Sequence, residues 1–202
     1  MLIAVDGPSA SGKGTIAKAL ARHFGLHYLD TGTLYRMVGL MVQRRGVNPA
    51  NEEACAAIAA SLDPASFADT ELRGELVGGY ASKVAVLPKV RTALLHFQRD
   101  FASLKPGAVL DGRDIGTVIC PEADYKFFVT ASFEARTKRR HLESAGETLA
   151  SVKADIMARD QRDAARAVNP LKPASDAVVI DTSNITAQQA VAQVIALIKS
   201  PR

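Results

Sequence analysis

The chain has 202 residues, of which 48% are hydrophobic and 23% charged, and its formal net charge is +4. This composition is typical of a globular protein and argues against disorder, and the length suits one domain over residues 1–202. The apolar runs are too short to span a bilayer, and no basic segment leads into an apolar signal region. We therefore expect a cytoplasmic protein with no membrane partner.

Five apolar runs alternate with helical segments, a pattern that predicts an α/β fold. The sheet is expected to be five-stranded and parallel, with helices on both faces. Ligands in such folds lie beyond the carboxyl ends of the strands, where Asp6, Asp30, Asp111 and Asp181 follow the predicted strands. The runs are residues 2–5, 27–29, 108–110, 126–129 and 177–180.

The first predicted strand leads into a glycine-rich loop and then a helix, as in a site for a nucleoside triphosphate. Backbone N–H groups of such a loop surround the phosphates, and Lys13 is placed to reach the β- and γ-phosphates. The usual hydroxyl position is taken by Gly14, so Thr15 is expected to supply the hydroxyl that binds Mg²⁺. The predicted ATP-binding residues are Gly7, Pro8, Ser9, Ala10, Ser11, Gly12, Lys13, Gly14 and Thr15.

Two competing interpretations use residues of the same region: a dinucleotide-binding loop and a metal site. The spacing of Gly12, Gly14 and Ala17 imitates the dinucleotide fingerprint, but there the first glycine directly follows the strand, and here a full loop intervenes. Hydride transfer is therefore the weaker alternative. His23 and His27 have the spacing of a helical metal pair, but Gly25 between them predicts the end of the helix.

A second polar patch follows the strand at 27–29, where residues 29–36 read LDTGTLYR. Thr31 or Thr33 could be a helix N-cap, whereas Arg36 on an otherwise apolar helix suggests a ligand. Residues 51–101 contain no clear strand, and we expect them to form an insertion over the site. A hinged cover suits phosphoryl transfer because water must be excluded.

The next patch is DGRDIG at residues 111–116. Asp111 ends an apolar strand and resembles a Walker-B acid, which holds Mg²⁺ directly or through water. Further on, Arg136 and Arg140 are four residues apart, and an anion between them would offset their repulsion. Residues 144–147 are predicted to separate two charged helices, and this segment is a candidate hinge.

The last patch is RDQRDAAR at residues 159–166, with Arg159, Arg162 and Arg166 on one helical face. A solvated helix in which Asp163 pairs with Arg159 is the simpler interpretation. Residues 186–189 carry a capping-box pattern that predicts the start of the last helix. The two cysteines, Cys55 and Cys120, have no C-x-x-C spacing and are expected to be buried free thiols.

Taken together, these motifs make the chain resemble the bacterial cytidylate kinases, P-loop enzymes that phosphorylate CMP and dCMP. The resemblance covers nearly the whole chain. It implies an insert for the monophosphate at about residues 32–104, a lid at 139–160 and a monomer. The sequences that carry it are GPSASGKGT at 7–15, LDTGTLYR at 29–36, DGRDIGTV at 111–118, RDQRDAAR at 159–166 and PLKPASDAVVIDTS at 170–183.

The resemblance also implies roles for individual residues. Lys13, Asp111, Arg113 and Arg162 would be catalytic, Arg136 and Arg140 would help bind ATP, and Thr15 and Asp111 would hold Mg²⁺. An acceptor at Asp114 would select the cytosine amino group over the uracil carbonyl. The implied CMP-binding residues are Thr31, Arg36, Ser82, Arg91, Arg113, Asp114, Arg159, Asp163 and Arg166.

The expected reaction converts CMP or dCMP and ATP to CDP or dCDP by direct in-line transfer, without a covalent intermediate. A phosphate oxygen is largely ionised near neutral pH, so no general base is needed. A kinase for a small hydroxylated metabolite such as shikimate is the near alternative. An ATP-driven switch or nucleic-acid-binding module is the alternative from another class; the modest positive charge and the basic cluster at 138–141 fit nucleotides better than nucleic acid.

Overall fold

The computed structural model describes residues 1–72, 74–144, 146–165 and 169–199. It divides the chain into two compact units, one of residues 1–29 with 101–202 and one of residues 30–100. The first contains the sheet, and the second is helical in its described residues. The second unit overlaps the range 32–104, whose role as an insert stays a prediction.

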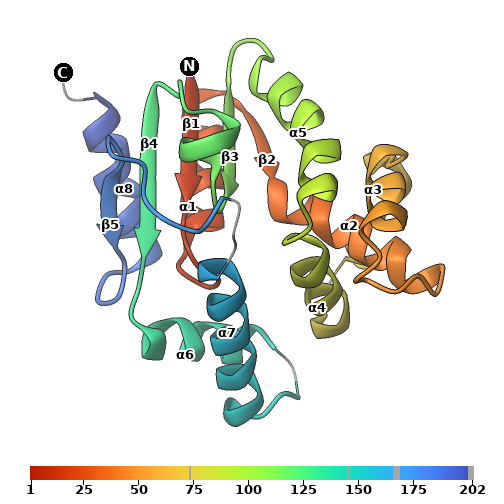
Figure 1. The fold of residues 1–202 in the computed structure, drawn as a ribbon. Coiled ribbons are helices and arrows are strands. Elements are labelled where there is room, and N and C mark those ends of the chain that lie inside the picture. The colour runs from red at the N-terminus through yellow and green to blue at the C-terminus, as the bar shows by residue number, and fades with distance from the viewer. Residues whose placement is uncertain (73, 145, 166–168, 200–202) are drawn as a thin grey trace. The chain divides into compact units, whose positions relative to one another are not determined.

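The sheet has five strands in the order β2-β3-β1-β4-β5 (Figure 1). Strand β1 pairs in parallel with β3 and with β4, and β4 pairs in parallel with β5. The predicted α/β fold with a five-stranded sheet is confirmed, and each strand lies within two residues of its expected bounds. The strands are β1 (Leu2–Asp6), β2 (His27–Asp30), β3 (Ala108–Gly112), β4 (Tyr125–Thr130) and β5 (Val178–Asp181).

Two helices pack with the sheet around one apolar core. Ile16 and Leu20 of α1 (Lys13–Phe24) and Val194 of α8 (Ala187–Lys199) join strand residues such as Val5 and Val129 there. The predicted capping box of α8 is present: Thr186 N–H donates to Gln189 Oε1 at 2.9 Å, and Gln189 N–H donates to Thr186 Oγ1 at 3.2 Å.

The remaining elements of the first unit follow β3 and β4. A π-helical turn, η2 (Ile115–Ile119), lies in contact with β1 and β3 (Figure 1). Helices α6 (Phe133–Glu143) and α7 (Leu149–Ala164) contact each other, and the expected break between two charged helices lies between them. The thiols of Cys55 and Cys120 are free and buried, as predicted.

The second unit is built from helices, and its tightest contact is between α2 and α4. A Cβ on Gly39 of α2 would lie 2.6 Å from the backbone nitrogen of Ala81 in α4, so only glycine permits this approach. The N-cap of α2 is Asp30, so the suggestion that Thr31 or Thr33 caps it was wrong. The helices are α2 (Thr31–Arg44), α3 (Glu52–Ala60), the short η1 (Pro64–Ser66), α4 (Glu75–Val84) and α5 (Pro88–Ala102).

Candidate active site

The glycine-rich loop runs from the end of β1 to the start of α1. A Cβ on Gly7 would lie 2.1 Å from the carbonyl oxygen of Val129 in β4, so the loop can leave the strand here only with glycine. Gly12 is the N-cap of α1 in the left-handed conformation, and Lys13 is the first residue of the helix. The N-terminal N–H groups of α1 therefore begin at the end of the loop, and Lys13 Nζ lies 3.5 Å from the Pro8 carbonyl oxygen of the same loop, an arrangement suited to a phosphate.

Gly14 lies close to a carboxylate, which bears on the prediction that Thr15 supplies the hydroxyl. A Cβ at position 14 would lie 3.1 Å from Oδ2 of Asp111, at the end of β3. A serine or threonine there would therefore crowd a carboxylate, whereas Thr15 lines the neighbouring cavity. Oδ2 of Asp111 also accepts a hydrogen bond from the Tyr28 hydroxyl at 3.2 Å, which orients the carboxylate.

Asp6 connects β1 to the turn that follows β3. Its carboxylate accepts hydrogen bonds from the backbone N–H groups of Ile115 and Gly116, both at 2.8 Å. Burial outweighs these two bonds and raises the pKa of Asp6 to about 6 from 3.8, with a smaller contribution from the nearby carboxylate of Asp114. Sequence reasoning noted Asp6 only as a strand end; its partners lie 109 and 110 residues away and carry no sequence signal.

Arg113 is held by the helix that carries the arginine face. Its Nε donates to Oδ2 of Asp163 at 2.7 Å, and the Asp163 side chain is only 6% exposed. Helix α7 is therefore not simply a solvated, salt-bridged surface at Asp163. Arg159 and Arg162 lie on the same helix, and Arg166 lies outside the described residues.

Arg136 and Arg140, which were expected to have an anion between them, each have a carboxylate neighbour. Arg136 donates to both carboxylate oxygens of Asp160, at 3.1 and 2.7 Å, and also to the carbonyl oxygen of Ser9 at 3.3 Å. Arg140 lies 3.8 Å from Glu143. Each guanidinium thus has a carboxylate neighbour, and the role of these arginines toward ATP stays a prediction.

The second unit contains four of the predicted CMP-binding residues. Thr31 begins α2, and Arg36 of the same helix donates to the Leu72 carbonyl oxygen at 3.1 Å. Arg91 of α5 is buried, lies over the ring of Tyr35 and donates to the Ala85 carbonyl oxygen at 3.1 Å. Ser82 lies on α4, which contacts α2.

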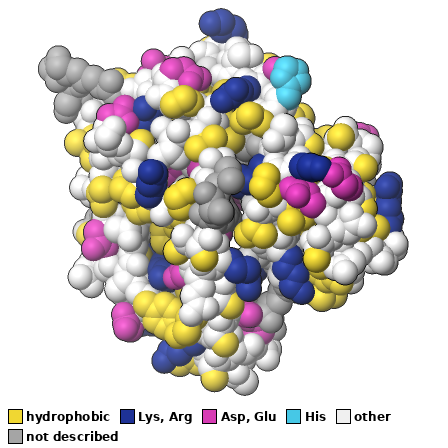
Figure 2. Space-filling view, in the orientation of Figure 1, with side chains coloured by type: hydrophobic (Ala, Val, Ile, Leu, Met, Phe, Trp, Pro, Cys, Tyr) yellow, Lys and Arg dark blue, Asp and Glu magenta, His cyan; other side chains and the backbone are white. Residues whose placement is uncertain are grey.

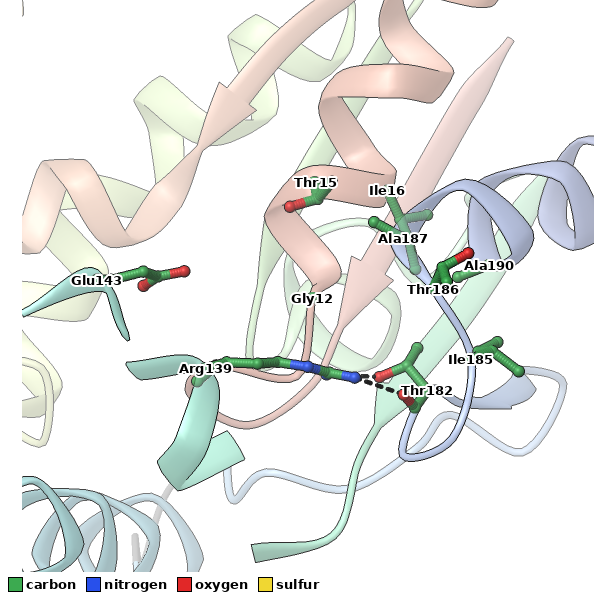
Figure 3. Close-up of a pocket in the computed structure, with 11 residues that line it drawn as sticks. Gly12, Thr15, Ile16, Arg139, Glu143, Thr182, Ile185, Thr186, Ala187 and Ala190 are labelled. Atoms are coloured by element: carbon green, nitrogen blue, oxygen red, sulfur yellow. Dashed lines mark hydrogen bonds between the residues drawn. The ribbon is translucent and has the colours of Figure 1, made fainter. Parts of the chain in front are cut away.

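A cavity of about 270 Å³ opens beside the glycine-rich loop (Figure 3). Its wall includes Gly12 and Thr15, and the guanidinium of Arg139 in α6 points to Thr182, at the start of the turn between β5 and α8. Sequence reasoning missed Arg139 and Thr182, although both lay within segments that it singled out, the basic cluster and the motif at 170–183. The lining residues are Ala10, Gly12, Thr15, Ile16, Arg139, Glu143, Thr182, Ile185, Thr186, Ala187 and Ala190.

Comparison with known proteins connects this geometry to a family. A family model described as cytidylate kinase matches residues 3–200. The chain belongs to the cytidylate kinase family. A curated cytidylate kinase of Rhodopseudomonas palustris is 51% identical over 206 residues, covering 100% of this chain and 98% of the relative. One of Paramagnetospirillum magneticum is 51% identical over 208 residues, covering 100% and 99%.

Family membership makes the chain a kinase and a transferase, as its motifs predicted, rather than a hydride-transfer enzyme. Among solved structures, an uncharacterized protein from Eubacterium ventriosum aligns with a TM-score of 0.61 at 16% identity, covering 100% of this chain and 99% of the other. That likeness supports the fold alone. Among the described residues, no helix has the length and apolar character needed to cross a membrane.

Proposed function

We propose that this chain transfers the γ-phosphoryl group of ATP to CMP and dCMP, directly and in line, and gives CDP and dCDP. The observation that carries the proposal is the cavity whose wall joins the glycine-rich loop to Arg139 and the β5–α8 turn, in a chain of this family. The cavity has room for a nucleoside next to a loop suited to phosphates. We further propose that the enzyme works as a cytoplasmic monomer, in line with the family resemblance.

ATP is assigned to this cavity and the loop together. The base would lie between Arg139 and the turn at 185–187, where a guanidinium can stack on an aromatic ring, and the phosphates would reach Lys13. Arg136 supports the loop from outside through its bond to the Ser9 carbonyl. Arg140 is assigned to the same nucleotide from the family resemblance.

The residues present fit a magnesium ion bound with ATP. Thr15 offers a hydroxyl and Asp111 a carboxylate, both hard oxygen donors, and the carboxylate lies close to Gly14, the residue before Thr15. No cluster of three metal-ligating side chains occurs among the described residues, which suits a cation held mainly by phosphate oxygens and water. When bound, Mg²⁺ would neutralise charge on the phosphates.

CMP is assigned to the arginines and to Asp114. Arg36 and Arg113 are assigned to the monophosphate from the family resemblance, and guanidinium donors match phosphate oxygens. Asp114 would accept a hydrogen bond from the cytosine amino group. The remaining assignments, from the family resemblance, are Thr31, Ser82, Arg91, Arg159, Asp163 and Arg166.

The chemistry asks the protein for positioning and charge rather than for a base. The CMP phosphate is already an anion near neutral pH, so its oxygen can attack without losing a proton to the protein. Lys13, Arg113 and Arg162 would offset charge that develops on the transferring group. Because no general base is needed, Asp111 would be available to bind the metal ion.

An alternative role as a nucleic-acid-binding module would call for a gathered basic surface. On the face in view in Figure 2, the Lys and Arg side chains are scattered among apolar, acidic and other side chains. Small nucleotides bound at one site fit this distribution better than a polyanion does.

The test is a coupled assay with Mg·ATP and a panel of acceptors: CMP, dCMP, UMP, AMP, GMP and shikimate. We expect CMP and dCMP to be consumed fastest. UMP is expected to react at least about a hundredfold less efficiently, because its carbonyl would face the Asp114 carboxylate. Faster consumption of shikimate or of a purine nucleotide would contradict the proposal.

A further inference from the structure

Thr182 lies where three segments of the first unit meet, directly after β5. Its side chain is buried, and its Oγ1 lies 2.8 Å from the carbonyl oxygen of Ser11 in the glycine-rich loop. Oγ1 also accepts a hydrogen bond from Nη1 of Arg139 in α6 at 2.9 Å (Figure 3). One hydroxyl therefore touches the loop, the strand end and the helix that forms the far wall of the cavity.

The Thr182 hydroxyl has two carbonyl acceptors within reach. The Ser11 carbonyl oxygen lies at 2.8 Å, and the Thr130 carbonyl oxygen, which also receives the backbone N–H of Thr182 at 2.9 Å, lies at 3.1 Å. The shorter distance favours Ser11 as the acceptor of the proton, and the lone pairs of Oγ1 remain for Arg139. The Thr182 hydroxyl thus donates to the glycine-rich loop and accepts from α6.

Arg139 depends on the same residue for its orientation. Nη2 donates to the Thr182 carbonyl oxygen, while Nη1 lies 3.4 Å from the Ser11 carbonyl oxygen. A Cβ on Gly12 would be 3.9 Å from both Arg139 Nη1 and Thr182 Oγ1, so this cluster lies against the loop itself. The guanidinium is fixed at the point where the cavity meets the phosphate loop.

We propose that Thr182 is a positioning residue for the donor nucleotide. Its hydroxyl holds the Ser11 carbonyl and the Arg139 guanidinium in one arrangement, which sets the distance between the base side and the phosphate side of the cavity. The inference rests on the proposed function only in taking ATP as the ligand. CMP binding does not pass through this contact.

The substitution that isolates the hydroxyl is Thr182→Val, which keeps the shape and removes both the donor and the acceptor. The Ser11 carbonyl then loses its short hydrogen bond, and Arg139 loses one of its acceptors. We expect the Kd and KM for Mg·ATP to rise about tenfold, with the KM for CMP unchanged within about twofold. Thr182→Ser restores the hydroxyl and should return the Kd for Mg·ATP to within about twofold of the original.

A matched control comes from the helix that carries Arg139. Thr137 is buried in α6, and its hydroxyl donates to the Phe133 carbonyl oxygen at 2.8 Å, within the helix. Thr137→Val therefore removes a buried threonine hydroxyl without touching the loop. It should leave the Kd for Mg·ATP unchanged, even where it lowers the melting temperature.

The experiment measures Mg·ATP binding to the full chain by calorimetry, together with steady-state KM values, for the three variants and the original. Weaker Mg·ATP binding in Thr182→Val alone, with rescue by Thr182→Ser, supports the proposal. Unchanged binding in Thr182→Val, failure of Thr182→Ser to rescue, or an equal loss in Thr137→Val overturns it.

A double-mutant cycle tests the coupling itself. Arg139→Met and Thr182→Val should together weaken Mg·ATP binding less than the product of their separate effects, because both break the same contact. Independent effects would overturn the proposed coupling. Binding is measured without an acceptor, so a chain that binds Mg·ATP but fails to phosphorylate CMP would refute the proposed function and leave this comparison decisive.

Discussion

Arg113 is oriented by its ion pair with Asp163, which lies 50 residues later in the chain, on α7. This contact leads to a prediction about a single residue. Asp163→Ala removes the partner of Arg113 Nε and leaves a guanidinium that is only 21% exposed without that carboxylate. A misplaced Arg113 should lower kcat/KM for CMP by about a hundredfold, and Asp163→Asn should lower it less because the amide oxygen can still accept. Steady-state kinetics with CMP as the varied substrate checks this.

The control for that variant is another ion pair of the same unit. Lys126 and Asp176 are 2.7 Å apart, and neither belongs to the assigned CMP-binding residues, so Asp176→Ala should leave kcat/KM for CMP unchanged, although stability should fall because the Lys126 side chain is only 9% exposed. Equal losses of activity in Asp163→Ala and Asp176→Ala would contradict a specific role for the Arg113 contact.

Asp6 predicts a pH dependence of stability. In the unfolded chain this carboxyl ionises near 3.8, whereas burial raises the pKa to about 6 in the folded chain. Between these two pKa values the carboxyl of Asp6 ionises only in the unfolded chain, so the free energy of unfolding falls by about 3 kcal/mol as pH rises from about 4 to about 6. Below the pKa of the unfolded chain, the carboxyl is protonated in both states and no stability is lost.

Urea unfolding of the original and of Asp6→Asn from about pH 4 to pH 7 measures this effect. The difference in unfolding free energy between the two should change by about 3 kcal/mol over that range, with the variant favoured as pH rises. Asp6→Asn also replaces one carboxylate oxygen with an NH2 group, which cannot accept a hydrogen bond from the backbone N–H that faces it. This loss should lower the free energy of unfolding by about 1–3 kcal/mol at every pH. Parallel pH curves for the two proteins would refute the raised pKa.

At the scale of elements, the approach of α2 to α4 depends on a missing side chain. Gly39→Ala would place its Cβ 2.6 Å from a backbone nitrogen, which cannot swing away, so we expect a loss of about 1–3 kcal/mol. A Cβ on Gly79 of α4 would meet no atom within 4 Å beyond its chain neighbours and the nearby backbone of its own helix, so Gly79→Ala should stabilise by up to about 1 kcal/mol. Denaturant unfolding of both variants gives the comparison, and a destabilised Gly79→Ala would contradict it.

The elements that the sequence predicted well are those that are set by local patterns. Buried strands appear as short apolar runs, the end of α1 is marked by Gly25, and the capping box marks α8. The π-helical turn at 115–119 could not be predicted in this way, because the Asp6 carboxylate that accepts from its first N–H groups lies 109 and 110 residues earlier in the chain.

The candidate site also has a part that local sequence predicts and a part that depends on contacts between residues far apart in the chain. The glycine-rich loop is contiguous in sequence, so its residues could be named in advance. The partners of Arg113 and Arg136 could not, since Asp163 and Asp160 lie 50 and 24 residues away. Thr182, which is 171 residues from Ser11, reaches the loop only because β4 and β5 pair in parallel.

For the whole molecule, the assigned ATP and CMP residues predict where each nucleotide slows hydrogen exchange. The glycine-rich loop and the cavity both belong to the unit of residues 1–29 and 101–202, whereas Arg36 and Arg91 belong to the unit of residues 30–100. Mg·ATP alone should therefore protect the amides of residues 7–15 and 182–187. CMP alone should protect residues 31–36 and 113–116.

The size of the protection follows from binding linkage. A ligand at about 100 times its Kd stabilises the bound form by about 2.7 kcal/mol, which slows exchange through opening of that region by up to about a hundredfold. Hydrogen exchange followed by mass spectrometry resolves the two ligands separately. Protection of 31–36 by Mg·ATP alone, with none at 7–15, would reverse the assignment of donor and acceptor, because a ligand stabilises only the segments whose opening releases it.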